Sequence, residues 1–158
     1  MAGKKAVSPE AGGGIVDRPV ITTQEKVELL RGVDLFSQAS VEELYQLATL
    51  AREVGFPPQW VIFQETDIGD AFYIVHCGKA ECVSNLGELR EVLGPGDVFG
   101  LHSALTRGMR NARATALERT VAVSVAAEDL FTLLSNNMEM VASMFEYFIR
   151  KLGMNPRS

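Results

Sequence analysis

The period of apolar and polar positions changes twice along the chain, which predicts helices at both ends and a β-rich block between them. The first predicted helix follows Thr22 and has its apolar residues at helical spacing: Val27, Leu29, Leu30 and Val33. Ser40 and Glu43 then form a capping-box pattern, which satisfies free N–H groups at the start of a helix. This pattern predicts a helix of about ten residues with three leucines on one face, Leu44, Leu47 and Leu50.

Short strand-like segments separated by turn residues occupy the middle of the chain. Pro57-Pro58 forbids helix there, and the aromatic and β-branched residues that follow favour strands. The predicted strands cover residues 61–63, 72–75, 80–84, 89–93, 114–117 and 121–125. The predicted turns lie at residues 67–70, 85–87 and 94–97. Short strands at this spacing are typical of a sandwich, barrel or roll.

Apolar residues return to helical spacing near the C-terminus. One predicted helix carries Leu130, Phe131, Leu133 and Leu134. The next ends at Gly153 and carries Val141, Met144, Phe145, Phe148 and Leu152. We therefore expect a flexible tail at residues 1–21, one domain at 22–153 and a short tail at 154–158. The glycine run at 12–14 supports the first boundary, and the sequence has no internal repeat.

Composition excludes several classes of function. A chain of 158 residues, 47% apolar and 22% charged, is typical of one globular domain. Its net charge of −5 argues against nucleic acid as a partner. No apolar run reaches the roughly 18 residues of a membrane span, and no secretion signal follows Lys4-Lys5. We expect a cytoplasmic protein without direct membrane insertion, in which Cys77 and Cys82 are reduced thiols.

The segment from Phe99 to Arg113 carries the candidate chemistry. Gly100 opens a predicted short helix at 101–106, and the free N–H groups at a helix start attract anions. Arg110 and Arg113 follow, and an arginine can hold a phosphate through two parallel hydrogen bonds. The segment therefore predicts an anion pocket with a phosphate as its ligand. Solvated surface charge is the alternative interpretation, and the residues alone leave both open.

Four segments, in order, resemble the cyclic-nucleotide-binding domain of catabolite activator proteins, kinase regulatory subunits and nucleotide-gated channels. Leu35-Phe36 before the Ser40 helix resembles the start of that domain. Residues 69–78 resemble its GD-x-x-Y-I-V-x-x-G hairpin, and residues 94–100 resemble the approach to its phosphate-binding cassette. Residues 110–118 resemble its R-S-A-x-x-x-A-L-E motif. The resemblance implies a mainly β fold with flanking helices: a β-roll (double-stranded β-helix or jelly roll) with N-terminal helices and C-terminal lid helices.

The resemblance also places the cassette at Gly100–Arg113 and implies which of its residues meet the ligand. Arg110 would pair with the cyclic phosphate, and the backbone at the short helix would supply further donors. The ligand-binding residues expected on this basis are Gly100, Leu101, His102, Ser103, Arg110, Asn111, Ala112 and Arg113. The last helix would lie over the purine as a lid, with Met144, Phe145 and Phe148 near the base. The expected ligand is cAMP or cGMP, and no cofactor is required.

This sequence departs from the family pattern at several positions. Leu101 stands where the family has a glutamate that takes the ribose 2′-hydroxyl. Loss of one charged hydrogen bond weakens binding roughly 10- to 150-fold. His102 replaces an aliphatic residue, and Gln59 and Thr66 stand where glycines are usual in the first hairpin. Arg113 replaces a threonine-like residue, so the pocket is either adapted to another anion or has lost its ligand.

Two functions follow from these observations. The first is a regulatory module that senses a cyclic nucleotide or related phosphate and signals through its last helix. The second is a degenerate β-roll that serves as a docking or dimerisation scaffold. It would form a homodimer or contact an effector domain of a larger channel, kinase or transporter. The five residues after Gly153 leave no room for a helix-turn-helix, so a complete transcription factor is not expected. An enzyme is not expected either, because His76, Cys77 and Cys82 lack the spacing of a metal or catalytic site.

Overall fold

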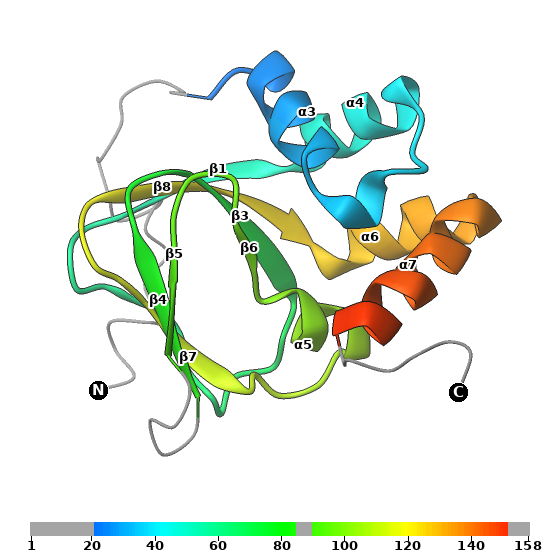
Figure 1. The fold of residues 1–158 in the computed structure, drawn as a ribbon. Coiled ribbons are helices and arrows are strands. Elements are labelled where there is room, and N and C mark those ends of the chain that lie inside the picture. Colours follow the sequence, from blue (N-terminus) through cyan, green and yellow to red (C-terminus); the bar gives the residue numbers. More distant parts are fainter. Residues whose placement is uncertain (1–20, 85–89, 152–158) are drawn as a thin grey trace.

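The computed structural model describes residues 21–84 and 90–151 (Figure 1). Its N-terminal helices are α3 (Thr23–Arg31), the short 3₁₀ helix η1 (Asp34–Phe36) and α4 (Val41–Leu50). The predicted capping box is confirmed, because the Glu43 N–H donates to Ser40 Oγ at 3.1 Å and the Ser40 N–H donates to Glu43 Oε1 at 2.9 Å. A second capping box at Thr22 starts α3. Both α3 and α4 therefore begin where a side chain accepts from the free N–H groups of the helix.

The buried face of α4 differs from the prediction at one position. Leu44 and Leu47 are buried as expected, but Leu50 is 56% exposed and Ala48 is fully buried in its place. Leu50 is the last residue of the helix, and position 48 lies four residues after Leu44 on the same face. The small alanine side chain lets α4 approach its neighbours closely.

Two four-stranded antiparallel sheets form the β-roll. One has the order β1-β8-β3-β6, formed by Arg52–Phe56, Thr120–Ala126, Ala71–Cys77 and Val98–Phe99. The other has the order β2-β7-β4-β5, formed by Val61–Phe63, Ala112–Ala116, Ala80–Ser84 and Arg90–Leu93. The prediction of a mainly β fold with flanking helices is confirmed. Strand β1 was not predicted, and the predicted turn at 85–87 lies outside the described residues.

Strands β3 and β8 lie between two hydrophobic cores. Phe72, Ile74 and Val123 belong to the core that includes the helices. Val75 and Ala122 belong to the core inside the roll. Because successive side chains point to opposite faces of a strand, burial on both faces requires nearly continuous apolar sequence. This explains why residues 121–125 show an apolar run instead of a regular alternation.

A strained turn joins β1 to β2. The non-glycine residues with left-handed backbone in the described part of the chain are Gln59, with φ of 69°, and Arg107, with φ of 55°. Gln59 thus has the conformation for which the family uses glycine, whereas Thr66 does not. The Gln59 N–H donates to the Ala116 carbonyl oxygen at 2.7 Å, which helps to hold the turn.

The C-terminal helices α6 (Ala127–Ser135) and α7 (Met138–Lys151) lie on the same side of the strands as α3 and α4 (Figure 1). Asn137 caps α7, because its Oδ1 accepts from the Met140 N–H at 2.9 Å. The Asn137 amide also donates to Glu43 Oε1 at 2.9 Å, and Met140 is fully buried. The start of α7 is therefore anchored to α4. The expected end at Gly153 lies outside the described residues.

Of the expected N-terminal tail, the structure describes Ile21 alone. This side chain is 2% exposed and packs with the helical core, and its N–H donates to Glu53 Oε1 at 2.8 Å. Residues 21–84 and 90–151 contain no helix with the length and apolar character needed to cross a membrane.

Candidate functional site

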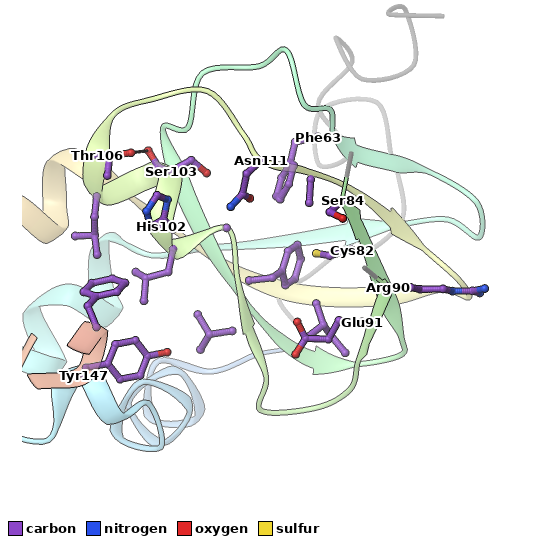
Figure 2. A pocket seen from close by; sticks show the side chains of 18 residues that line it. Phe63, Cys82, Ser84, Arg90, Glu91, His102, Ser103, Thr106, Asn111 and Tyr147 are labelled. Atoms are coloured by element: carbon purple, nitrogen blue, oxygen red, sulfur yellow. Dashed lines mark hydrogen bonds between the residues drawn. The ribbon is translucent and has the colours of Figure 1, made fainter. Parts of the chain in front are cut away.

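A cavity of about 840 Å³ lies between the β4–β5 hairpin, the short helix α5 (Leu101–Thr106) and the end of α7 (Figure 2). Its wall includes six of the eight predicted ligand residues: Gly100, Leu101, His102, Ser103, Asn111 and Ala112. Arg110 and Arg113 do not line it. Six of the eight residues predicted to bind the ligand therefore share one cavity wall, whereas the two arginines that suggested a phosphate stand outside it.

Gly100 is required where α5 begins. Its φ of 79° lies in the left-handed region, which favours glycine. A Cβ atom at this position would lie 2.8 Å from Arg110 Nη1 and 3.2 Å from Phe63 Cε2. The missing side chain therefore lets the Arg110 guanidinium pass directly behind the backbone that faces the cavity.

Arg110 is 4% exposed and joins three parts of the fold. Its Nη1 donates to the Gly100 carbonyl oxygen at 2.8 Å and to Ser103 Oγ at 3.3 Å. Its Nη2 donates to the Ala71 carbonyl oxygen at 2.7 Å. The guanidinium carbon lies 4.0 Å from the centre of the Phe63 ring. Arg110 thus connects the start of β3 to α5, which is a structural role that the sequence did not indicate.

The charge of Arg110 is only partly compensated. Its Nε is buried and has no hydrogen-bond partner among the described residues. Asp70 Oδ1 lies 3.9 Å from Nη2, but the Asp70 side chain is 82% exposed, so water screens this ion pair. Burial lowers the pKa of the guanidinium, and nearby acidic groups, Asp70 among them, offset part of this effect. A buried cation with an unpaired donor would gain from an additional anionic partner.

Leu101 and His102 begin α5 on the cavity wall. Leu101 is 7% exposed and also packs into the helical core, so the position held by glutamate in the family is here an apolar contact. His102 is exposed, and its ring meets Phe148 of α7 edge-on at 6.3 Å between ring centres. Asn111 is also exposed, and Figure 2 shows its side chain at the cavity beside Ser103.

Ala112 lines the cavity and Arg113 does not, because the two are neighbours on strand β7. Ala112 is the cross-strand partner of Ser84 in the neighbouring strand β4, and both residues line the cavity. Arg113 pairs with Val83 and is exposed. Since neighbouring residues of a strand point to opposite faces, only one of the two can face the cavity.

A family model for the cyclic nucleotide-binding domain matches residues 53–137 of this chain. The match covers more than half of the 158 residues and includes the whole of the cassette described above. The chain belongs to the cyclic nucleotide-binding domain family. Its antiparallel roll with flanking helices is the fold expected for that family, of the type found in regulatory proteins.

Three similar proteins illustrate the range of this family. The domain is 32% identical over 109 residues to the cyclic AMP receptor protein of Thermus thermophilus, covering 66% of this chain and 50% of that protein. It is 33% identical over 112 residues to a cGMP-dependent protein kinase of Toxoplasma gondii, covering 71% of this chain and 11% of the kinase. It superposes on the crystal structure of the Thermus thermophilus catabolite activator protein with a TM-score of 0.65 and 29% identity, covering 76% and 58% of the two chains. The chain thus spans about half the length of the bacterial regulators it matches.

The lid helix of this cyclic nucleotide-binding domain presents other residues than predicted. Phe148 lines the cavity as expected, but its second aromatic partner there is Tyr147. Phe145 is 64% exposed, and Met144 packs on the helical core. Neither Met144 nor Phe145 lines the cavity, so the prediction is wrong for both. Helical spacing identifies residues that share a face but not which neighbour covers that face.

Residues of the β4–β5 hairpin complete the wall, and the sequence analysis missed them: Cys82, Ser84, Arg90, Glu91 and Leu93. Alternation along the two strands could have grouped Cys82 with Ser84 and Glu91 with Leu93, but not Arg90, whose side chain points away from the cavity (Figure 2). Burial raises the pKa of the Cys82 thiol to about 12, with the nearby Glu91 charge as a smaller cause. Cys82 is therefore a protonated, weakly polar part of the wall.

Proposed function

We propose that this domain is a ligand-sensing regulatory module that takes a cyclic nucleotide, or a related phosphate, in the cavity and signals through α7. One observation carries the proposal: the same cavity is lined by the cassette and by the end of the lid helix. Ser103 and Asn111 lie on the cassette side, and Tyr147 and Phe148 belong to α7. A ligand that fills the cavity therefore contacts both the recognition segment and the element that would transmit the signal.

In this proposal the phosphate lies against Gly100 and Ser103 and takes over part of the bonding of Arg110. The 3.3 Å contact from Nη1 to Ser103 Oγ is the weakest of the three bonds of the guanidinium, so it is the one a phosphate oxygen would replace. The buried positive charge of the guanidinium behind Gly100 is a second reason for an anion to bind at this end of the cavity. Asn111 offers an amide at the same end of the cavity.

Leu101 sets the expected affinity. A ribose 2′-hydroxyl next to this side chain loses water without gaining a charged partner. Binding should therefore be roughly 10- to 150-fold weaker than in a site that has the family glutamate. Micromolar to millimolar dissociation constants are the range to search.

Signalling would use the two ends of α7 differently. Asn137 and Met140 anchor its start, whereas Tyr147 and Phe148 rest on the cavity. Ligand contact at the second pair shifts the population of α7 positions about the anchored start. Amide exchange of residues 144–151 should slow at saturating ligand, and unchanged exchange there would refute this mechanism.

A thermal-shift titration with cAMP and with cGMP tests binding. At 100 times its dissociation constant, a ligand adds about 2.7 kcal/mol, or about 5–11 °C in melting temperature for a domain of this size. Asn111→Ala should reduce the shift, because Asn111 lines the cavity and its side chain makes no hydrogen bond to another described residue. Arg113→Ala is the matched control, since Arg113 is exposed and does not line the cavity.

The outcomes of this titration distinguish binding in the cavity, binding elsewhere on the domain and no binding. A shift that Asn111→Ala weakens and Arg113→Ala leaves intact supports the proposed site. No shift with either nucleotide at millimolar concentration refutes it. Equal losses in both variants place the nucleotide elsewhere.

The exposed face of α7 favours a second candidate function, a dimerisation scaffold. Met138 and Phe145 are 75% and 64% exposed, and Ala142 and Ile149 lie on the same stripe. Their spacing of four, three and four residues is that of the apolar positions in a two-helix coiled coil. A second copy of the chain would cover this stripe by pairing its own α7 against it.

Sedimentation equilibrium without ligand tests the scaffold. A dimer that Phe145→Glu dissociates, and that Val41→Glu on the exposed side of α4 leaves intact, supports it. Val41 is 60% exposed, so it matches Phe145 in accessibility. A monomer at all concentrations, or a dimer that resists Phe145→Glu, refutes a scaffold built on α7.

A further inference from the structure

The cavity wall opposite the cassette is formed by the β4–β5 hairpin (Figure 2). Glu91 and Leu93 of β5 line the cavity, and Glu91 is the cross-strand partner of Cys82, which also lines it. Val92 lies between them on the other face of the sheet and is 52% exposed. Figure 2 shows the Glu91 carboxylate directed into the cavity, on the opposite side from His102.

Glu91 has no hydrogen-bond or ion-pair partner within residues 21–84 and 90–151. The neighbouring cation does not serve it, because Arg90 Nε lies 2.6 Å from Glu81 Oε1. Figure 2 shows the Arg90 side chain pointing away from the cavity. At one end, the cavity therefore faces a carboxylate that has no partner among the described residues, and at the other end Arg110 stands behind the cassette.

The other polar groups near this wall are weaker candidates for ligand recognition. Cys82 is a weak hydrogen-bonding group. Ser84 and Tyr147 both line the cavity, but each already takes part in another interaction. A ligand that reaches the hairpin thus meets one strong acceptor, the Glu91 carboxylate, and it must bring N–H or O–H donors to it.

A cyclic nucleotide with its phosphate at Gly100 and Ser103 points its base away from the cassette, because phosphate and base lie at opposite ends of the sugar. Guanine carries two adjacent donors on its Watson–Crick edge, N1–H and the N2 amino group. Adenine carries one donor, the N6 amino group, beside the lone pair of N1. A carboxylate only accepts, through two oxygens, so it pairs with both guanine donors but opposes the adenine N1 lone pair.

We infer that Glu91 determines base specificity and that this domain prefers a guanine cyclic nucleotide to an adenine one, an inference that rests on the proposed function. Glu91 is exposed, so water competes for its carboxylate and the preference is moderate. A preference of about tenfold in dissociation constant is expected from one additional charge-assisted hydrogen bond at such a site.

Replacing Glu91 by glutamine should reverse the preference. A glutamine amide offers one acceptor and one donor, which match the N6 amino group and the N1 atom of adenine. The side chain keeps its length, and Glu91 supports no other described residue, so the variant should fold like the wild type. Glu118→Gln is the matched control, because Glu118 is exposed, does not line the cavity and has no ion-pair partner among the described residues.

Isothermal titration of the full chain with cGMP, cAMP and cIMP tests the inference. The wild type and Glu118→Gln should bind cGMP about tenfold more tightly than cAMP, with cIMP between them because it lacks the N2 amino group. Glu91→Gln should lose this ratio or invert it. If all nucleotides bind but their ratio is the same in Glu91→Gln, Glu91 does not read the base, and the proposed function stands. If none binds at millimolar concentration, the proposed function fails and this inference fails with it.

Discussion

Arg110→Met tests whether the cassette arginine stabilises the ligand-free fold. Methionine is an unbranched apolar side chain that replaces the Arg110 stem but removes the guanidinium over the Phe63 ring. The variant therefore loses the bonds to the carbonyl oxygens of Gly100 and Ala71, and the longer contact with Ser103 Oγ. If these bonds join β3 to α5, the ligand-free protein must lose stability.

The magnitude follows from the environment of the lost bonds. Arg110 is 4% exposed, so water replaces the guanidinium poorly. A buried acceptor left without a partner costs about 1–3 kcal/mol. Two carbonyl oxygens are affected, and the loss of the cation over the ring adds about 0.5–2 kcal/mol. Removal of a buried charge returns part of this, so the expected net loss is about 2–5 kcal/mol, a large share of the roughly 5–15 kcal/mol of a typical domain.

Urea unfolding without ligand, followed by far-ultraviolet circular dichroism and by the fluorescence of the single tryptophan, Trp60, measures this loss. Arg113→Met is the control, because Arg113 is exposed and should change the free energy of unfolding by less than about 0.5 kcal/mol. If Arg110→Met also stays within that range, the guanidinium contributes nothing to the ligand-free fold. Arg110 would then be held in place for the ligand alone, and the structural role argued from its bonds would be wrong.

Three further predictions follow from single positions. Gln59→Gly should raise the melting temperature, because left-handed backbone costs a non-glycine residue roughly 1–2 kcal/mol. The greater entropy that glycine gives the unfolded chain cancels only part of this gain. Differential scanning calorimetry measures the change. Leu101→Glu should destabilise the ligand-free domain by about 2–4 kcal/mol, because Leu101 is 7% exposed, yet tighten cyclic-nucleotide binding roughly 10- to 150-fold. With its pKa raised to about 12, Cys82 should stay protonated at pH 8 and resist a disulfide reagent that labels the exposed Cys77.

The results that would contradict these predictions are equally direct. A lower melting temperature for Gln59→Gly would mean that the glutamine side chain supports the turn. A Leu101→Glu variant that is destabilised but binds no more tightly would place the ribose away from α5. Equal labelling rates for Cys77 and Cys82 are expected in denaturant. Equal rates in the native protein would show that the fold does not keep the Cys82 thiol protonated.

The sequence predicted local features well where a few neighbouring residues decide the geometry. The capping box of Ser40 and Glu43 starts α4, and α5 covers residues 101–106 as expected. Gly100 was recognised as the start of α5, and its φ of 79° is a local requirement that any fold containing this turn would have. The departures at Gln59 and Thr66 were also visible in the sequence, but only the structure shows that Gln59 has left-handed backbone and Thr66 does not.

Predictions from the sequence were wrong where they depended on which other element packs against a helix or strand. Phe145 and Tyr147 are two residues apart, yet only Tyr147 faces the cavity, because packing against η1 and α6 sets the rotation of α7. Leu50 is exposed and Ala48 buried for the same reason. Helical period shows which residues share a face, and packing against other elements selects the face that is covered.

By itself, then, the sequence determined the order of helices and strands, the location of the cassette and the family to which it is similar. Those properties depend on contiguous motifs and on hydrogen bonds between residues close together in the sequence. Only the tertiary structure decided that Arg110 is bonded to Gly100 and Ala71, and that Glu91 faces the same cavity as His102. Residue 110 meets residue 71 through a separation of 39 positions. Such contacts depend on strand pairing and on the packing of α5 and α7, which no local pattern encodes.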